Sequence, residues 1–452
     1  MLKFSEVERR PRGLMITAAF LEVALLFFAV SLNAQPKNNA PYSRIGLGEL
    51  VTPALSSMGF GGLSAAYADP LHINFQNPAS LGFLAATTFE AGMFTEHSKL
   101  KFNNQSTTVW SGNLSHLSLA FPLRNPLNDI LEKRKSSFSW GMNISLLPNT
   151  TVGYDIQTEE VNAHVDTTLN TFQGSGGTDK LVWGNGFRYK NFAWGVNMGY
   201  LFGKLVSDRS VLFRNLEAAY DDHFLDNISV RSFIWSIGGQ YRYDFDKTVE
   251  EDNVLRRKSL LAGFYGNSSK GFTTRSTIYR IRENFLYSPV QSDTLYQEVD
   301  AKGHGTLPSE WTIGVTYEDA GRLRLGAEYS ISNWSKYKNE AKPETLFDSR
   351  RIAVGAEYIP DIASYNNYLK RIRYRAGFYH RSDPRLSDLN QYAFTLGFGL
   401  PVILPRQKTS FVNLAFEFGQ YDTSDAIKET FVKMALSFTL NDTSWFFKRK
   451  FG

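Results

Sequence analysis

The chain has 452 residues, a formal net charge of +5 and no cysteine. The lack of cysteine excludes a disulfide scaffold, a thiolate metal site and a lipid-modified N-terminal cysteine. Basic and acidic residues are interspersed without a separate basic block, which argues against a nucleic-acid-binding protein. Aromatic residues make up 14% of the chain, with 35 Phe, 22 Tyr and 35 Gly, and this mixture favours a β-rich protein.

Residues 1–34 are predicted to be a signal peptide for the general secretory route. Three arginines between residues 9 and 12 precede the apolar run Leu14–Val30, and cleavage is expected between Ala34 and Gln35. An uncleaved anchor helix is the alternative. Beyond this segment the sequence has no apolar run of about 18 residues, so an integral protein of this kind must cross the membrane as a closed barrel.

Residues 35–85 follow neither the period of a strand nor that of a helix. They are rich in Gly, Pro, Asn and Ala, but Leu, Ile, Phe and Met are frequent and charge is sparse. We therefore expect a compact irregular segment rather than a disordered linker, which is the alternative.

From about residue 86 the chain alternates between bulky apolar and small or polar residues. In residues 192–203 one series is bulky: Phe192, Trp194, Val196, Met198, Tyr200 and Phe202. The intervening series is mostly Gly, Ala and Asn. Successive strand side chains point to opposite faces, so one face fits lipid and the other fits a lumen. A secreted soluble β-protein is the alternative.

The same division recurs in about 14 segments up to residue 440. Long connections are expected at 149–178, 205–227 and 270–307, each after an odd-numbered strand, and long loops on one rim are typical of bacterial membrane barrels. The fold class is therefore predicted to be all-β: a transmembrane antiparallel β-barrel of about 14 strands over residues 86–440. Residues 35–85 are expected to form an N-terminal hatch inside the lumen, and residues 441–452 a short periplasmic tail.

Two stretches resemble a known family. Residues 69–84, DPLHINFQNPASLGFL, are similar to the segment that joins the hatch to the first strand in the FadL family of outer-membrane transporters for long-chain fatty acids and other hydrophobic compounds. Asn77, Pro78 and Ala79 match the hatch motif, whereas Ser80 replaces the usual Gly. Residues 145–156, SLLPNTTVGYDI, resemble the third strand of that family. The resemblance implies a hatch-plugged outer-membrane barrel, in FadL- or TodX-like form, that takes up hydrophobic compounds.

A row of arginines is predicted to face the lumen. The candidate ligand-binding residues are Arg371, Arg373, Arg375, Arg381 and Arg242. Guanidinium groups at these positions would suit an acidic head group. The structural alternative is that the arginines pair with lumen carboxylates, predicted to include Glu90, Glu328, Glu357 and Glu417, and so hold the hatch.

The sequence contains no HExxH pair, no GxSxG elbow and no phosphate loop, so neither an enzyme nor a cofactor is predicted. Two functions are left open. One is a passive channel for small hydrophobic molecules such as fatty acids, and the other is a non-transporting barrel subunit of an outer-membrane assembly or secretion complex. Expected partners are outer-membrane lipids and lipopolysaccharide, a hydrophobic small molecule, or other outer-membrane proteins.

Overall fold

Fourteen antiparallel strands pair around a closed ring in which the last strand returns to the first. In order around the ring they are β2 (Thr87–Phe102), β3 (Gln105–Pro122), β4 (Phe138–Val161), β5 (Thr167–Tyr189), β6 (Phe192–Phe213), β7 (Asp221–Asp244), β10 (Lys258–Asn267), β13 (Glu310–Asp319), β14 (Leu323–Ser332), β16 (Ser349–Tyr358), β17 (Arg373–Ser382), β18 (Asn390–Leu404), β19 (Lys408–Asp422) and β20 (Lys428–Asp442). The predicted all-β barrel of about 14 strands is confirmed.

This computed structural model describes residues 42–43, 48–50, 55–102, 105–124, 137–161, 167–214, 216, 219–245, 249–251, 254–256, 258–284, 286, 290–319, 321–404, 408–424 and 427–443. The predicted signal peptide and most of the predicted tail lie outside these residues. The shorter elements are β1 (Glu49–Leu50), α2 (Leu55–Met58), η2 (Pro78–Phe83), β8 (Val249–Glu251), β9 (Val254–Arg256), η3 (Trp334–Lys336), β15 (Lys338–Asn339) and η4 (Tyr368–Arg371).

Side chains divide between the two faces of the wall as predicted. On β6, Trp194 and Tyr200 are 47% and 46% exposed, whereas Ala193 and Leu201 are 0% and 3% exposed. Bulky residues therefore face outward and small residues inward, as a lipid-facing barrel requires. None of the helices in the described ranges reaches the length and hydropathy needed to cross a bilayer.

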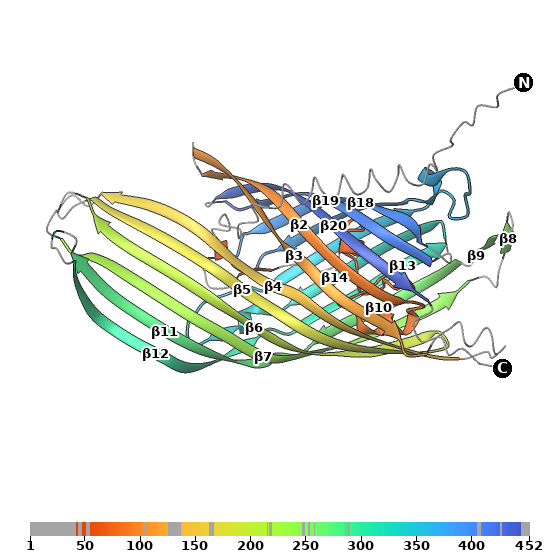
Figure 1. Cartoon of the computed structure of the whole chain (residues 1–452), viewed down its shortest axis with the longest axis horizontal. Coiled ribbons are helices and arrows are strands. Elements are labelled where there is room, and N and C mark those ends of the chain that lie inside the picture. The colour runs from red at the N-terminus through yellow and green to blue at the C-terminus, as the bar shows by residue number, and fades with distance from the viewer. Residues whose placement is uncertain are drawn as a thin grey trace, which may run out of the picture. The chain divides into compact units, whose positions relative to one another are not determined.

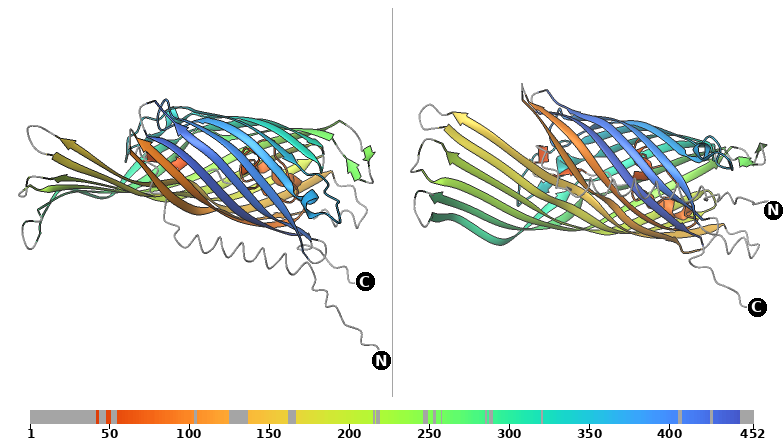
Figure 2. Two further views of the ribbon diagram at one scale, coloured as in Figure 1. Left: turned by 90° about the horizontal axis from the view of Figure 1, so that it is seen from above. Right: turned by 45° about the horizontal axis from the view of Figure 1, so that its top comes forward.

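Four strands of the ring continue past one rim and, with an added hairpin, form a six-stranded sheet that we call the extension (Figure 1). Its strands are β4, β5, β6 and β7 together with the hairpin β11 (Lys270–Asn284) and β12 (Gln291–Leu307). β7 pairs with β10 in the barrel, over Ile237–Asp244, and with β11 in the extension, over Asp221–Arg231. The views in Figure 2 show the same sheet projecting from the barrel.

The extension corrects the prediction of long loops. Most of 149–178, 205–227 and 270–307 is strand, not irregular connection. The alternation was weak there because both faces of the extension are polar enough to meet water, as in Leu205–Phe213, LVSDRSVLF. Hydrophobic patterning detects a strand only where one face is apolar.

The wall has a seam between β3 and β4. The two strands pair only from Leu117–Leu146 to Pro122–Gly141. Toward the extension, the described part of β3 pairs only with β2, and β4 pairs with β5 and, at Thr150 and Thr151, with β1. Backbone groups on facing edges of β3 and β4 are therefore not joined to each other along this stretch.

Candidate functional site

The N-terminal segment, residues 55–86, lies inside the barrel. Phe60, Asn77 and Ala79 are fully buried. Two apolar clusters join the segment to the wall. In the first, Ile73 and Leu81 of the segment pack with Val182 of β5. The second cluster likewise contains residues of both the segment and the barrel strands. The segment therefore packs against the inward face of the wall, and the hatch predicted for residues 35–85 stays a prediction.

Close approach of the segment explains why the inward residues are small. A Cβ atom on Gly186 would lie 2.2 Å from the carbonyl oxygen of Pro78. A Cβ atom on Gly377, on the opposite wall, would lie 2.2 Å from the backbone nitrogen of Gly61. Such distances are far below van der Waals contact, so glycine lets the backbone of the segment lie directly on the strands.

The motif at residues 77–79 shapes the turn at the centre of the segment. Asn77 accepts a hydrogen bond from the Ala79 backbone N–H at 3.1 Å, and Pro78 occupies the first turn of η2. The Asn77 side-chain amide donates to the Ala65 carbonyl at 2.7 Å and to the Phe264 carbonyl of β10 at 3.2 Å. Asn77 thus joins two parts of the segment to the wall.

Buried ion pairs hold the segment to the opposite wall. Asp69, which is 2% exposed, lies 2.6 Å from Arg373 and 3.3 Å from Arg324. Arg324 also pairs with Glu318 at 2.7 Å and with Glu357 at 2.9 Å. A single aspartate of the segment therefore connects strands β14 and β17.

Carboxylates of the wall also bind the backbone of the segment. Glu328 of β14 accepts hydrogen bonds from the Ser64 and Ala65 N–H groups, both at 2.7 Å. Glu90 of β2 accepts one from the Ile73 N–H at 3.2 Å. These contacts satisfy backbone donors that the irregular segment cannot pair within itself.

The five candidate arginines occupy different surroundings. Arg373 pairs with Asp69, Arg375 pairs with Glu357 at 2.6 Å, and Arg242 pairs with Glu318 at 3.2 Å. Arg371 lies in η4, before strand β17, with its guanidinium over the Tyr368 ring. Arg381, at the other end of β17, lines a cavity. Three of the five thus have carboxylate partners within the lumen.

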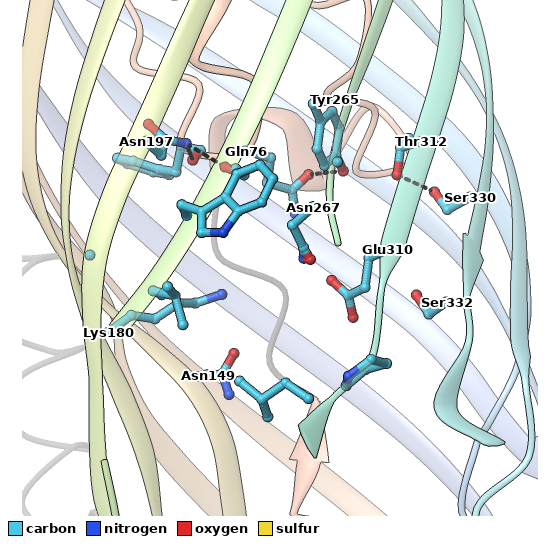
Figure 3. Close-up of a pocket in the computed structure, with 18 of the residues that line it drawn as sticks. Gln76, Asn149, Lys180, Asn197, Tyr265, Asn267, Glu310, Thr312, Ser330 and Ser332 are labelled. Atoms are coloured by element: carbon cyan, nitrogen blue, oxygen red, sulfur yellow. Dashed lines mark hydrogen bonds between the residues drawn. The ribbon is translucent and has the colours of Figure 1, made fainter. Parts of the chain in front are cut away.

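That cavity has a volume of 310 Å³ and lies between the segment and the extension. Gln76 of the segment, Lys180 of β5 and Glu310 of β13 point into it (Figure 3). Tyr265 donates a hydrogen bond to the Gln76 side chain at 3.0 Å. Apolar residues share the lining, among them Leu147, which directly follows the last β3–β4 pair. The cavity is therefore amphipathic and reaches the seam.

The prediction missed the charged residues of this cavity, Lys180, Lys270 and Glu310. One signal was available: Lys180 belongs to the same alternate series as the inward-facing Val182 and Gly184. Lys270 begins β11, in the stretch 270–307 that was predicted to be a loop, whereas Glu310 begins β13, a predicted strand, and was not assigned to the lumen. Asp69 was also missed, because it lies in the segment without a periodic pattern.

The family follows from a comparison with protein-family models. The BamG family model matches residues 15–452. The chain belongs to the BamG family. No curated protein sequence matches it.

Solved structures similar to this BamG-family chain include two toluene transporters and a FadL homologue. The Ralstonia pickettii toluene transporter TbuX has a TM-score of 0.52 at 12% identity, over 88% of this chain and 99% of TbuX. A Pseudomonas aeruginosa FadL homologue has a TM-score of 0.52 at 13% identity, with the same coverage of 88% and 99%. The Pseudomonas putida toluene transporter TodX has a TM-score of 0.51 at 14% identity, over 87% of this chain and 99% of TodX. The resemblance to FadL is thus confirmed at the level of the fold, and the family is BamG.

Proposed function

We propose that this protein is a non-transporting barrel subunit of an outer-membrane complex, and that it binds its protein partners through the extension. One observation carries the proposal. Strands β13, β14, β16 and β17 have 10 residues each, whereas β4 to β7 have 22 to 24. A membrane-spanning strand needs about 9–11 residues. The excess amounts to at least about 40 Å of additional length along each strand at roughly 3.3 Å per residue.

The edges of the extension suit the addition of a partner. Within the described residues, the outer edge of β12 pairs with β15 at Gly305 and Thr306, His304 exchanges hydrogen bonds with Glu340, and no strand is paired with the rest of this edge. β12 exposes Leu295, Tyr296 and Val299, which are 52%, 51% and 59% accessible to solvent. An ordered sheet edge with apolar side chains and free backbone groups is a surface for strand pairing with another chain.

The fixed segment supports the same proposal. A channel that runs along the lumen must displace residues 55–86, and these are held by the Asp69 ion pairs and by the Glu328 and Glu90 hydrogen bonds. In our proposal these contacts keep the barrel closed, and residues 35–85 serve as a plug. The barrel then anchors the extension beyond the membrane.

The register of the sheet allows a selective test. Asn267 of β10 pairs directly with Glu310 of β13, so residues 268–309 can be replaced by a two-residue turn without opening the ring. We expect this variant to fold, as judged by the heat-dependent gel shift of a barrel, but to lose the partners that co-purify after gentle detergent extraction. Replacing hairpin β8–β9 (Val249–Arg256) by a short turn is the matched control on the other rim. Isolation of the wild-type protein as a monomer under every mild extraction condition contradicts the proposal.

A second function, passage of small hydrophobic molecules such as fatty acids, is favoured by the cavity. The cavity adjoins the seam, and Lys180, Lys270 and Arg381 give it cationic groups for a carboxylate. The toluene transporters TbuX and TodX share the fold. Liposomes containing the purified protein test this function with a fluorescent fatty acid. Uptake above that of empty liposomes, abolished by a Lys180→Met substitution, supports passage, and no uptake excludes it.

A further inference from the structure

A hollow lies on the outward face of the sheet, where the apolar band of the barrel ends. The outward aromatic residues at this end are Tyr200, Phe202 and Phe233, which are 46%, 37% and 61% exposed. The next outward residues on the same strands are Lys204 of β6 and Arg231 of β7. The apolar face thus changes to a cationic one within a single step along each strand.

Strand pairing gathers further cations at this level. Lys204 is opposite Ser229 of β7, which is opposite Arg275 of β11, and Arg275 is opposite Lys302 of β12. In the neighbouring row of paired residues, which is closer to the apolar band of the barrel, Arg231 is opposite Thr273, and Thr273 is opposite His304. Because directly paired residues share a face, these basic side chains form one patch across four adjacent strands.

The hollow lies at the edge of this patch that is nearest the apolar band of the barrel, and it has a volume of 430 Å³. It is lined by the outward aromatic residues Tyr200 and Phe233 and by Arg231 and His304, and it is bordered by Phe272, whose side chain is buried in the cluster on the other face of the sheet. Ser232, Gly271, Thr273 and Gly305 complete the lining. The hollow therefore has an apolar side toward the membrane band and a basic, hydrogen-bonding side toward the extension.

Few carboxylates neutralise the patch. Arg275 pairs with Asp300 at 2.9 Å, and Glu340 accepts the His304 backbone N–H at 2.7 Å. On the other side, Asp179 of β5 is opposite Phe202. Among the described residues, Lys204, Arg231 and Lys302 have no carboxylate partner. Three exposed cations are therefore available to a ligand.

From this arrangement we infer that the patch, with its hollow, is a binding site for the phosphate-bearing, anionic headgroup of an outer-leaflet lipid. Aromatic residues mark the membrane–water interface, and basic residues directly beyond them meet the phosphates of the headgroups. The hollow holds the neck of the lipid against Tyr200 and Phe233, and Arg231 reaches the phosphate. The headgroup also fixes the base of the extension at the membrane surface. This site is independent of the function proposed above.

Binding of lipid to the purified, delipidated full chain tests the inference. The probes are phosphatidylglycerol and phosphatidylcholine with identical acyl chains, and bound lipid is counted by native mass spectrometry. We expect phosphatidylglycerol to bind more tightly, and the triple variant K204Q/R231Q/K302Q to weaken it roughly a hundredfold, at about fivefold for each charge removed. Excess inorganic phosphate should not displace the lipid, because phosphate alone lacks the apolar contacts.

The matched control is K99Q/K101Q/R350Q, which removes three exposed cations from other strands at the same rim. This control should bind phosphatidylglycerol like the wild type. Equal binding of the two lipids by the wild type overturns the inference, as does a triple variant that binds like the wild type. The heat-dependent gel shift verifies that each variant is folded, and the substitutions are all at exposed positions.

Discussion

The ion pairs of Asp69 provide the sharpest test of how the segment is held. In the Asp69→Asn variant, Arg324 keeps Glu318 at 2.7 Å and Glu357 at 2.9 Å. Arg373 loses its only carboxylate partner among the described residues, and it is 8% exposed. Leaving one charge of a buried pair without its partner costs about 3–5 kcal/mol. Because Arg324 remains neutralised, we expect a cost at the lower end of this range, about 3 kcal/mol.

The lack of cysteine in the chain makes this cost measurable. Ser80, in the segment, is 5% exposed, so a Ser80→Cys substitution places a nearly isosteric thiol that a maleimide reaches only when the segment moves. At a factor of ten per roughly 1.4 kcal/mol, the Asp69→Asn change should raise the labelling rate about a hundredfold. The assay compares labelling of S80C and D69N/S80C in detergent, both verified as folded barrels.

Asp300→Asn is the control for this experiment. Its pair with Arg275 is exposed on both sides, 56% and 52%, and an exposed pair contributes about 0–1 kcal/mol. D300N/S80C should therefore label at nearly the rate of S80C. Equal labelling of D69N/S80C and S80C would refute the reasoning and would mean that apolar packing alone holds the segment.

Three further outcomes are expected. Gly377→Ala should lower the temperature of the gel shift, because its Cβ would lie 2.2 Å from the Gly61 nitrogen, whereas Gly271→Ala, whose nearest neighbour is 3.8 Å away, should not. Hydrogen bonds from the side chain and backbone of Ser424 lower the pKa of Asp388 to about 2. The stabilisation of the 383–389 loop is thus complete above pH 3.8 and is lost as the pH falls toward 2; D388N should lose it at neutral pH, seen as faster proteolysis. Burial raises the pKa of Glu344 to about 6, so loop 340–348 should lose protection from hydrogen exchange as the pH rises from 4.5 past 6, and E344Q should remove this dependence.

The sequence by itself determined the wall of the barrel. Residues 192–203 alternate between bulky and small side chains, and Trp194 and Ala193 point outward and inward as that alternation requires. The physical reason is local: a strand turns successive side chains to opposite faces, and lipid on one face selects apolar residues there. The same rule placed 14 strands, because each one carries its own pattern.

Only the tertiary structure decided which lumen residues come together. Asp69 and Arg373 are 304 positions apart in the chain, and nothing in the pattern around Asp69 indicates its partner. The extension was equally hidden, because a sheet with water on both faces needs no apolar series, and the cations of the outward patch are assembled by cross-strand register from β6, β7, β11 and β12. Alternation reports the environment of one strand, whereas an ion pair, a cavity or a patch depends on which strands become neighbours.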